Sequence, residues 1–303
     1  MWDLVGNVGY VGTHSINIVS GLQYPINNAP VGTGQAGRPL YQKWGRSVTT
    51  NILQPWTYAN YHSLQTSLER RFTGGLMLKA VYTWSHSIDN NGTMYGGIPE
   101  YFYRNVGASD FDRRHNFRTA WIYELPWGPG RKWANDGVVG AIFGGWQVNG
   151  IFSSYSGMPF TVGTSSASLN APGSNQFADQ VLPEVEKLGN IGTGVPFFDP
   201  LAFRPVTAVR FGNSGRNMLY GPGAVNMDFG IFRAFRISEG KELQFRAESF
   251  NLTNTPHFNN PSATASDMSF NADGSLRSSG NFMAITSAQA DQRTFRFGLR
   301  FSF

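Results

Sequence analysis

The chain ends in a stretch that alternates strictly between apolar and polar residues, QRTFRFGLRFSF at positions 292–303. Successive side chains of an extended strand point to opposite faces, so a period of two predicts a strand rather than a helix. One face carries Arg296 and Arg300, and the other is wholly apolar, with Phe295, Phe297, Leu299, Phe301 and Phe303. The closing strand of a membrane β-barrel needs this pattern, with a lipid-facing apolar side and a lumen-facing polar side. The stretch also leaves open the last strand of a soluble β-sandwich.

The composition favours many strands joined by turns. The 303 residues include 36 Gly and 15% aromatic residues but only 14% charged residues, which suits strands better than helices. No apolar run approaches the roughly 18 residues of a transmembrane helix. The absence of cysteine excludes disulfides, zinc–thiolate sites and cysteine nucleophiles. The basic residues behind the net charge of +5 are dispersed among acidic ones, which argues against nucleic acid as a partner.

Alternation recurs along the chain and predicts about eight strands. They are expected at 2–11, 60–72, 76–85, 115–125, 144–157, 226–237, 241–252 and 292–303. Long loops, at 12–58, 86–113, 157–223 and 254–290, follow every odd-numbered strand, and shorter turns follow the even-numbered ones. Outer-membrane barrels sort their connections in this way, with short periplasmic turns and long extracellular loops. We therefore predict an all-β fold, an antiparallel transmembrane β-barrel or a part of one.

Arg233 interrupts the apolar face of the sixth predicted strand, where Ile231 and Phe235 are its neighbours on the same face. A β-bulge would turn the side chain away from that face. A position at the membrane interface would accommodate the charge equally well. The pattern alone does not choose between the two.

Five segments together resemble the C-terminal barrel of TonB-dependent outer-membrane receptors. They are NYHSLQTSLERRFTGGLMLKAVYTWSHSID, SDFDRRHNF, GGWQVNGIFSSYSGMPFTV, ELQFRAESFNLTNTPHF and TFRFGLRFSF, and they follow one another in the family's order. The likeness is strongest to the Oar-like receptors, which carry a carboxypeptidase-regulatory-like domain at the N-terminus. It implies that residues 1–303 are the C-terminal part of a barrel of about 22 strands, a fragment of a longer receptor.

The resemblance also implies a location and partners. The location is the outer membrane of a Gram-negative-type bacterium, where the barrel would contact lipid and the last strand would engage the barrel-assembly machinery. The longer parent would take up an unknown nutrient ligand in a TonB-dependent manner. The TonB complex would act only through a plug domain, and neither a plug nor a signal peptide is expected in this chain. The alternative is an autonomous small outer-membrane barrel with an adhesion or structural role.

The sequence offers little for catalysis, cofactors or metals. GTGQAG at 32–37 has the spacing of a dinucleotide fingerprint, but Pro30 and Pro39 flank it, so a flexible loop is the better interpretation. The five histidines have no metal-site spacing; they are His14, His62, His86, His115 and His257. No nucleophile elbow, P-loop or zincin motif is present. We expect neither an enzyme nor a bound cofactor.

Asp110 and Asp112, followed by two arginines, form the most suggestive charged cluster. Two carboxylates two residues apart would share a strand face, where they could act as an acid–base pair or bind calcium. The preferred interpretation is a lumen-facing salt-bridge network at the base of a loop. Asp89, Asn90 and Asn91 could likewise ligate calcium or simply form an Asx-rich turn.

Aromatic residues in the predicted loops are candidates for stacking on a ligand. They are Tyr41, Trp44, Trp56, Tyr95 and Tyr101, with Phe102 and Tyr103 beside the last. They could equally belong to the outer aromatic girdle of a barrel. Trp84 and Trp121, which fall on strands, are expected in a girdle.

Overall fold

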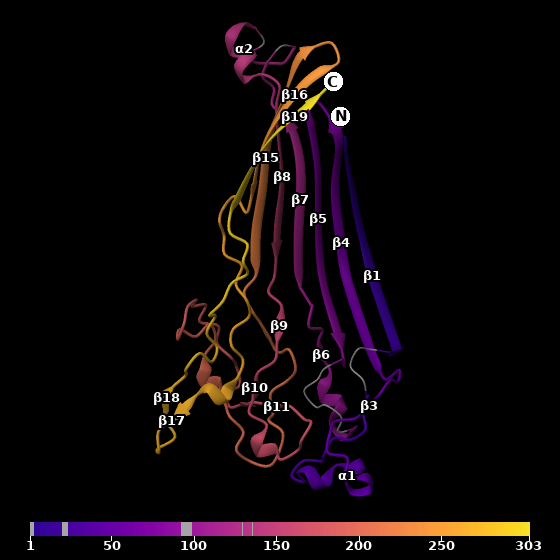
Figure 1. Cartoon of the computed structure of the whole chain (residues 1–303), viewed down its shortest axis with the longest axis vertical. Coiled ribbons are helices and arrows are strands. Elements are labelled where there is room, and N and C mark those ends of the chain that lie inside the picture. Colours follow the sequence, from indigo (N-terminus) through magenta and orange to yellow (C-terminus); the bar gives the residue numbers. More distant parts are fainter. Residues whose placement is uncertain (1–2, 20–23, 92–98, 129, 135) are drawn as a thin grey trace.

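A single curved sheet of long antiparallel strands forms the body of the molecule (Figure 1). The structure, a computed structural model, describes residues 3–19, 24–91, 99–128, 130–134 and 136–303. The long strands are β1 (Leu4–Ile18), β4 (Thr57–Thr73), β5 (Leu76–Asp89), β7 (His115–Glu124), β8 (Trp146–Tyr155), β15 (Ala224–Ser238), β16 (Lys241–Phe250) and β19 (Thr294–Ser302). They pair in chain order, and short β6 (Gly107–Ala108) adds to β5. The antiparallel all-β fold is confirmed.

The connections divide by length between the two ends of the sheet. Tight turns join β4 to β5 and β15 to β16, and β1 begins at the same end as β19 finishes (Figure 1). The first turn uses Gly74 and Gly75, both at positive φ (59° and 81°), as two-residue hairpins require. The four long loops gather at the opposite end, as predicted from their order.

The first strand is longer than predicted, and the first loop correspondingly shorter. β1 continues past Gly12 to Ile18, so the prediction of a strand ending at 11 and a loop starting at 12 was wrong. Residues 13–15 pair with 59–61 of β4 although their side chains are mostly polar. Apolar alternation therefore stops before the strand does, because backbone pairing continues beyond the apolar band.

Strand register gives the sheet one continuous apolar face. Residues opposite each other in a ladder point to the same side. Starting from Phe297, the pairing runs across six strands through apolar residues only: Ala247, Ile231, Val148, Tyr123 and Leu76. The row beginning at Arg296 lies on the other face and passes through Glu248, Gly230 and Asn149 before it reaches the apolar Ile122 and Met77. The apolar face of β19 thus continues across the sheet, and its contact with lipid stays a prediction.

Arg233 lies at the turn end of the apolar face. It pairs with Trp146, the first residue of β8, and the β15–β16 register shifts only between Arg236 and Ser238. No bulge is present at Arg233 itself, and its guanidinium lies 5.5 Å from the Trp146 ring centroid. The bulge is therefore excluded, and the position at the membrane interface stays a prediction.

The buried hydrophobic residues lie in the loops. Among the described residues, none of them belongs to the eight long strands. The larger cluster joins the third and fourth long loops, with Phe203, Phe282 and Met283 each fully buried. A second cluster around Phe177 and Leu169 includes Val31 of the first loop and Tyr101 of the second. Four long loops lie between β1 and β4, β5 and β7, β8 and β15, and β16 and β19. We call their described residues the cap, since they share these clusters.

Short strands and helices make up the rest of the structure. In the cap they are β2 (Tyr24–Pro25), η1 (Gln35–Gly37), α1 (Pro39–Trp44), β3 (Asn51–Ile52), η2 (Pro99–Asn105), β9 (Pro159–Phe160), β10 (Gly163–Thr164), η3 (Ala167–Leu169), β11 (Gln176–Phe177), β12 (Asp179–Gln180), η4 (Pro200–Ala202), β13 (Phe203–Arg204), β14 (Leu219–Tyr220), η5 (Ala265–Asp267), β17 (Ser269–Phe270) and β18 (Leu276–Ser278). At the turn end, α2 (Gly137–Phe143) lies between β7 and β8 (Figure 1). Among the described residues, no helix is long and apolar enough to cross a bilayer.

Candidate functional site

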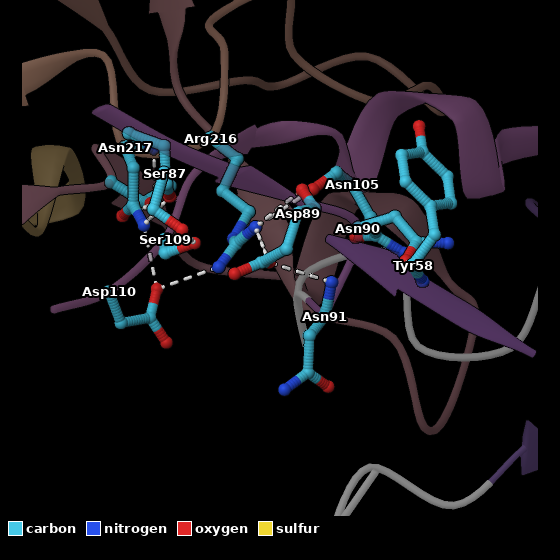
Figure 2. A network of polar contacts seen from close by, with 12 residues as sticks. Tyr58, Ser87, Asp89, Asn90, Asn91, Asn105, Ser109, Asp110, Arg216 and Asn217 are labelled. Atoms are coloured by element: carbon cyan, nitrogen blue, oxygen red, sulfur yellow. Dashed lines mark hydrogen bonds and ion pairs between the residues drawn. The ribbon is translucent and has the colours of Figure 1, made fainter. Parts of the chain in front are cut away.

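A buried arginine fastens the third long loop to the end of the sheet (Figure 2). The side chain of Arg216 is only 3% exposed, and one of its terminal nitrogens lies 2.7 Å from the Asp89 carboxylate at the end of β5. The same nitrogen donates to the Asp89 and Asn105 carbonyls, each at 3.1 Å. The other terminal nitrogen donates to Asp110 at 2.9 Å. This one side chain therefore joins the third loop, the second loop and the rim of the sheet.

The residues next to Arg216 and its partners pack closely around this contact. The side-chain Nδ2 of Asn217 donates to the Ala108 carbonyl at 2.7 Å and to the Asp110 carboxylate at 2.6 Å. A Cβ on Gly107 would lie 2.6 Å from the Arg216 carbonyl oxygen, so a larger residue would push the third loop away. We call Arg216, Asn217, Asp89 and Asp110 the rim clamp.

A second polar network lies beside the rim clamp. The Asp112 carboxylate, 1% exposed, accepts from the Ser87 amide at 2.8 Å and contacts Nδ1 of His86 at 2.9 Å. It also accepts from the Tyr220 hydroxyl at 2.8 Å, and Arg114 lies 3.3 Å away. Burial, the largest influence, raises the pKa of Tyr220 above its usual value, and the Asp112 carboxylate adds to the increase. Tyr220 remains a protonated donor at neutral pH, which holds β14 against the rim.

Asp110 and Asp112 lie in the turn between β6 and β7, so the expectation of a shared strand face was wrong. The Asp112 amide donates to the Ser109 carbonyl at 2.8 Å, and this turn directs the two carboxylates into separate networks. Asp89 forms an ion pair and also accepts from the Asn91 amide at 2.9 Å, an Asx-type turn. In the described part of the chain no three histidine, aspartate or glutamate residues are grouped as a metal site would require. The lumen-facing assignment of Asp110 and Asp112 stays a prediction.

The predicted ligand-stacking aromatics are placed in different ways. Trp56 packs against Tyr24 and Phe102, with ring centroids 5.6 and 4.9 Å away, and Tyr101 packs on Phe211 at 4.7 Å. These rings join one loop to another. Tyr41 and Trp44 are exposed on α1, by 39% and 65% respectively. Tyr95 lies outside the described residues.

The polar face of the sheet contains a groove at mid-height. Its volume is about 300 Å³, and its lining includes Met77, Ile122 and Ile151 on one side and the carboxylates of Asp228 and Glu248 on the other. Arg296 of β19 lies 4.0 Å from Glu248, on the same face. Arg300 is directly opposite Gln244 on that face as well. The predicted lumen-facing arginines thus belong to a mixed polar and apolar surface.

Sequence reasoning did not find Arg216 and Asn217. They lie in the stretch GNSGRNML, which has no periodicity and no acidic neighbour. Their partners at the rim of the sheet are more than a hundred residues away, at sequence separations of 106 to 127. The one available signal was the isolated positive charge in a long polar loop, and that signal is weak by itself.

The chain was compared with solved structures, curated proteins and protein families. A crystal structure of the outer membrane transporter YddB from Escherichia coli resembles the chain with a TM-score of 0.46 and 9% sequence identity. The match covers 99% of this chain and 30% of the transporter, so the chain spans less than a third of that protein's length. No curated protein matches the chain significantly. A family model described as an outer membrane beta barrel domain matches residues 1–296. The chain therefore belongs to the outer membrane beta-barrel domain family, and its place is the outer membrane.

Proposed function

We propose that the chain is the C-terminal part of the barrel of a TonB-dependent outer-membrane receptor that takes up a nutrient. The observation that carries this proposal is the cap. The four long loops share buried clusters and are fastened to the rim, which gives a preformed outer surface. A preformed surface binds with a smaller loss of conformational entropy than flexible loops do. Binding followed by passage along a polar wall is the task of a receptor.

The edges of the sheet support a larger barrel. β1 pairs with β4 and β19 pairs with β16, and the described residues provide no second strand neighbour for either. Unpaired backbone groups are strongly unfavourable in hydrocarbon, so both edges need strand partners, which are either further strands or each other. A barrel of about 22 strands, as in receptors of the Oar-like group, would supply them.

The ligand surface is proposed to include Tyr41 and Trp44 at the far end of the cap. Both rings are exposed on α1, and the Lys43 ammonium lies 4.6 Å from the Trp44 ring centroid. Exposed aromatic faces bind sugars and other flat or cationic ligands. Siderophores, oligosaccharides and peptides are the classes to compare.

Uptake assays in cells test the proposal. Cells that express the full-length parent, cells lacking it, and cells lacking TonB would receive a labelled siderophore, oligosaccharide or peptide. One class should enter only the first strain, and Trp44→Ala should reduce its uptake several-fold while leaving the barrel inserted. Uptake of that class that persists without TonB would contradict the proposal.

A cross-linking experiment distinguishes the larger barrel from a closed small one. Gly9 and Gly298 lie on the two edge strands, and a Cβ at either would meet no atom within 4 Å. Because the chain has no native cysteine, a Gly9→Cys/Gly298→Cys double variant provides a clean cross-linking pair. A short bismaleimide should not join the two edges in outer membranes of cells that express the native gene with these two substitutions. Efficient intramolecular cross-linking would favour the autonomous barrel with an adhesion role.

The last strand is also proposed to carry the signal for the barrel-assembly machinery. Phe303 is 94% exposed and follows the apolar face of β19. Removal of Phe303 should reduce membrane insertion in cells more than it reduces refolding of purified protein into detergent. An equal effect on both would indicate a loss of stability rather than of recognition.

A further inference from the structure

The connection between β7 and β8 contains α2 and lies at the turn end, far from the cap (Figure 1). Within α2, Val138 is 73% exposed, Val139 58%, and Ile142 and Phe143 54% each. Gly140, on the other side of the helix, is buried. At 3.6 residues per turn, positions 138, 139, 142 and 143 lie on one side. The short helix therefore presents one apolar face outward.

This helix is attached next to the apolar face of the sheet. The indole nitrogen of Trp146 donates to the Ile142 carbonyl at 3.1 Å, and Arg233 donates to the same carbonyl. Trp146 and Arg233 are directly paired, and they share the apolar face with Phe245, whose ring is 6.1 Å from that of Trp146. The residues at the turn end of the apolar face thus hold the C-terminus of α2.

Backbone contacts brace the segment before the helix. Trp133 donates its amide to the Pro126 carbonyl at 3.0 Å, and the Gly128 amide donates to the Trp133 carbonyl at 2.9 Å. A Cβ on Gly128 would lie 2.5 Å from the Cα of Gly144, so the two ends of the connection cross closely. The orientation of α2 is consequently fixed by the fold.

The residues beside α2 are those expected at a membrane surface. Trp133 is 52% exposed, and the Lys132 ammonium lies 5.1 Å from its ring centroid. Tryptophan and lysine side chains occupy the headgroup level of bilayers, where one end of the side chain is apolar and the other is hydrated. Short connections of outer-membrane barrels face the periplasm, so the nearest lipid is the inner leaflet.

We propose that α2 is an interfacial anchor that binds the phospholipids of the inner leaflet of the outer membrane. The apolar face of the helix enters the boundary between headgroups and acyl chains; it consists of Val138, Val139, Ile142 and Phe143. Lys132 and Trp133 lie among the headgroups. An apolar helical face next to charged and aromatic residues binds membranes in this way. The inference rests on the outer-membrane location of the barrel and is independent of the proposed transport role.

Single-cysteine labelling tests this anchor, because the natural chain has no cysteine. The full-length parent carrying Val139→Cys or Phe143→Cys, with any cysteine outside residues 1–303 replaced, would be labelled with a polarity-sensitive fluorophore and reconstituted into phosphatidylethanolamine–phosphatidylglycerol vesicles. The vesicles would contain lipids spin-labelled either near the headgroup or near the end of the acyl chain. Two matched variants calibrate depth: Leu299→Cys on the apolar strand face, 71% exposed, and Ile191→Cys in the cap, 47% exposed.

The anchor predicts that labels at positions 139 and 143 are quenched several-fold more by the headgroup-proximal spin label than by the deep one. The label at 299 should respond more strongly to the deep spin label, and the label at 191 to neither. Labels at 139 and 143 that behave like the one at 191 would overturn the proposal. Protection of those labels by contact with a second copy, detected as concentration-dependent cross-linking without lipid quenching, would overturn it as well.

Discussion

Replacing Arg216 with methionine should loosen the cap while leaving the sheet intact. The guanidinium is 3% exposed and its principal partner, the Asp89 carboxylate, is 9% exposed. Removing one member of a buried ion pair leaves the other charge unpaired, which destabilises a protein by about 3–5 kcal/mol. The Asp89 and Asn105 carbonyls also lose a donor. Because these contacts lie between the loops and the rim, the loss should appear in the opening of the cap.

Hydrogen exchange of the purified protein in detergent micelles measures this opening directly. The amides of Ala178 and Ser214 are bonded within the third loop, to the carbonyls of Val162 and Ala178 respectively. In Arg216→Met their exchange should be faster by a factor that corresponds to about 3–5 kcal/mol. Amides in the middle of β16 should retain their protection, and the folded barrel should keep its mobility in electrophoresis without boiling.

Two further variants make the result specific. Arg216→Met combined with Asp89→Asn and Asp110→Asn should recover much of the lost protection, because no charge is then left unpaired. Arg210→Met, which removes a pair with Asp179 whose arginine side chain is 53% exposed, should change cap opening by only about 0–1 kcal/mol. Unchanged exchange in the Arg216→Met single variant would refute the rim clamp.

Three other predictions concern the sheet and the cap. Phe297→Arg should lower the stability of the inserted barrel by about 2–4 kcal/mol if position 297 is near the membrane midplane. Gly298→Arg and Arg296→Ala, on the opposite face, should lower it much less. Urea titrations in lipid vesicles measure these changes, and equal effects would show that the assignment of the two faces is wrong. Gly150→Ala should destabilise the barrel by about 1–3 kcal/mol, because the added Cβ would lie 2.2 Å from the Trp121 ring. Gly9→Ala is the matched control, since its Cβ would meet no atom within 4 Å. Thermal unfolding of both variants measures the difference. A hydrogen bond from Arg210 lowers the pKa of Asp179, so this link stabilises above the unfolded pKa of about 3.9 and is lost as the pH falls through the lower folded value. Arg210→Met should weaken the acid dependence of exchange at the Asn213 amide, which donates to Asp179.

The strands could be predicted because apolar and polar side chains alternate along each of them with a period of two. Phe295 to Phe303 show this pattern most clearly, and register carries it across to Leu76. Where strands pair beyond their apolar stretch, the sequence shows no such alternation. The part of β1 around His14 was therefore missed, although it pairs with Asn60 in the structure.

The cap could not be predicted in the same way. Its core brings together Phe160, Phe203 and Phe282, which lie in segments without periodicity and far apart in the chain. Charged contacts such as Arg216 with Asp89 depend on how the loops pack against one another, and a single sequence does not specify that packing. Trp56 and Tyr101 show the consequence, since both pack on aromatic rings of other loops, contacts that the sequence did not predict.

The most direct test of the account is the environment of successive positions along β19. A polarity-sensitive label would be placed on single cysteines from 295 to 301 in turn, in the barrel inserted into vesicles. The account predicts that a lipid-phase quencher acts on the labels at 295, 297, 299 and 301 and a water-soluble quencher on those at 296, 298 and 300. Uniform access of the water-soluble quencher to all seven positions would contradict it.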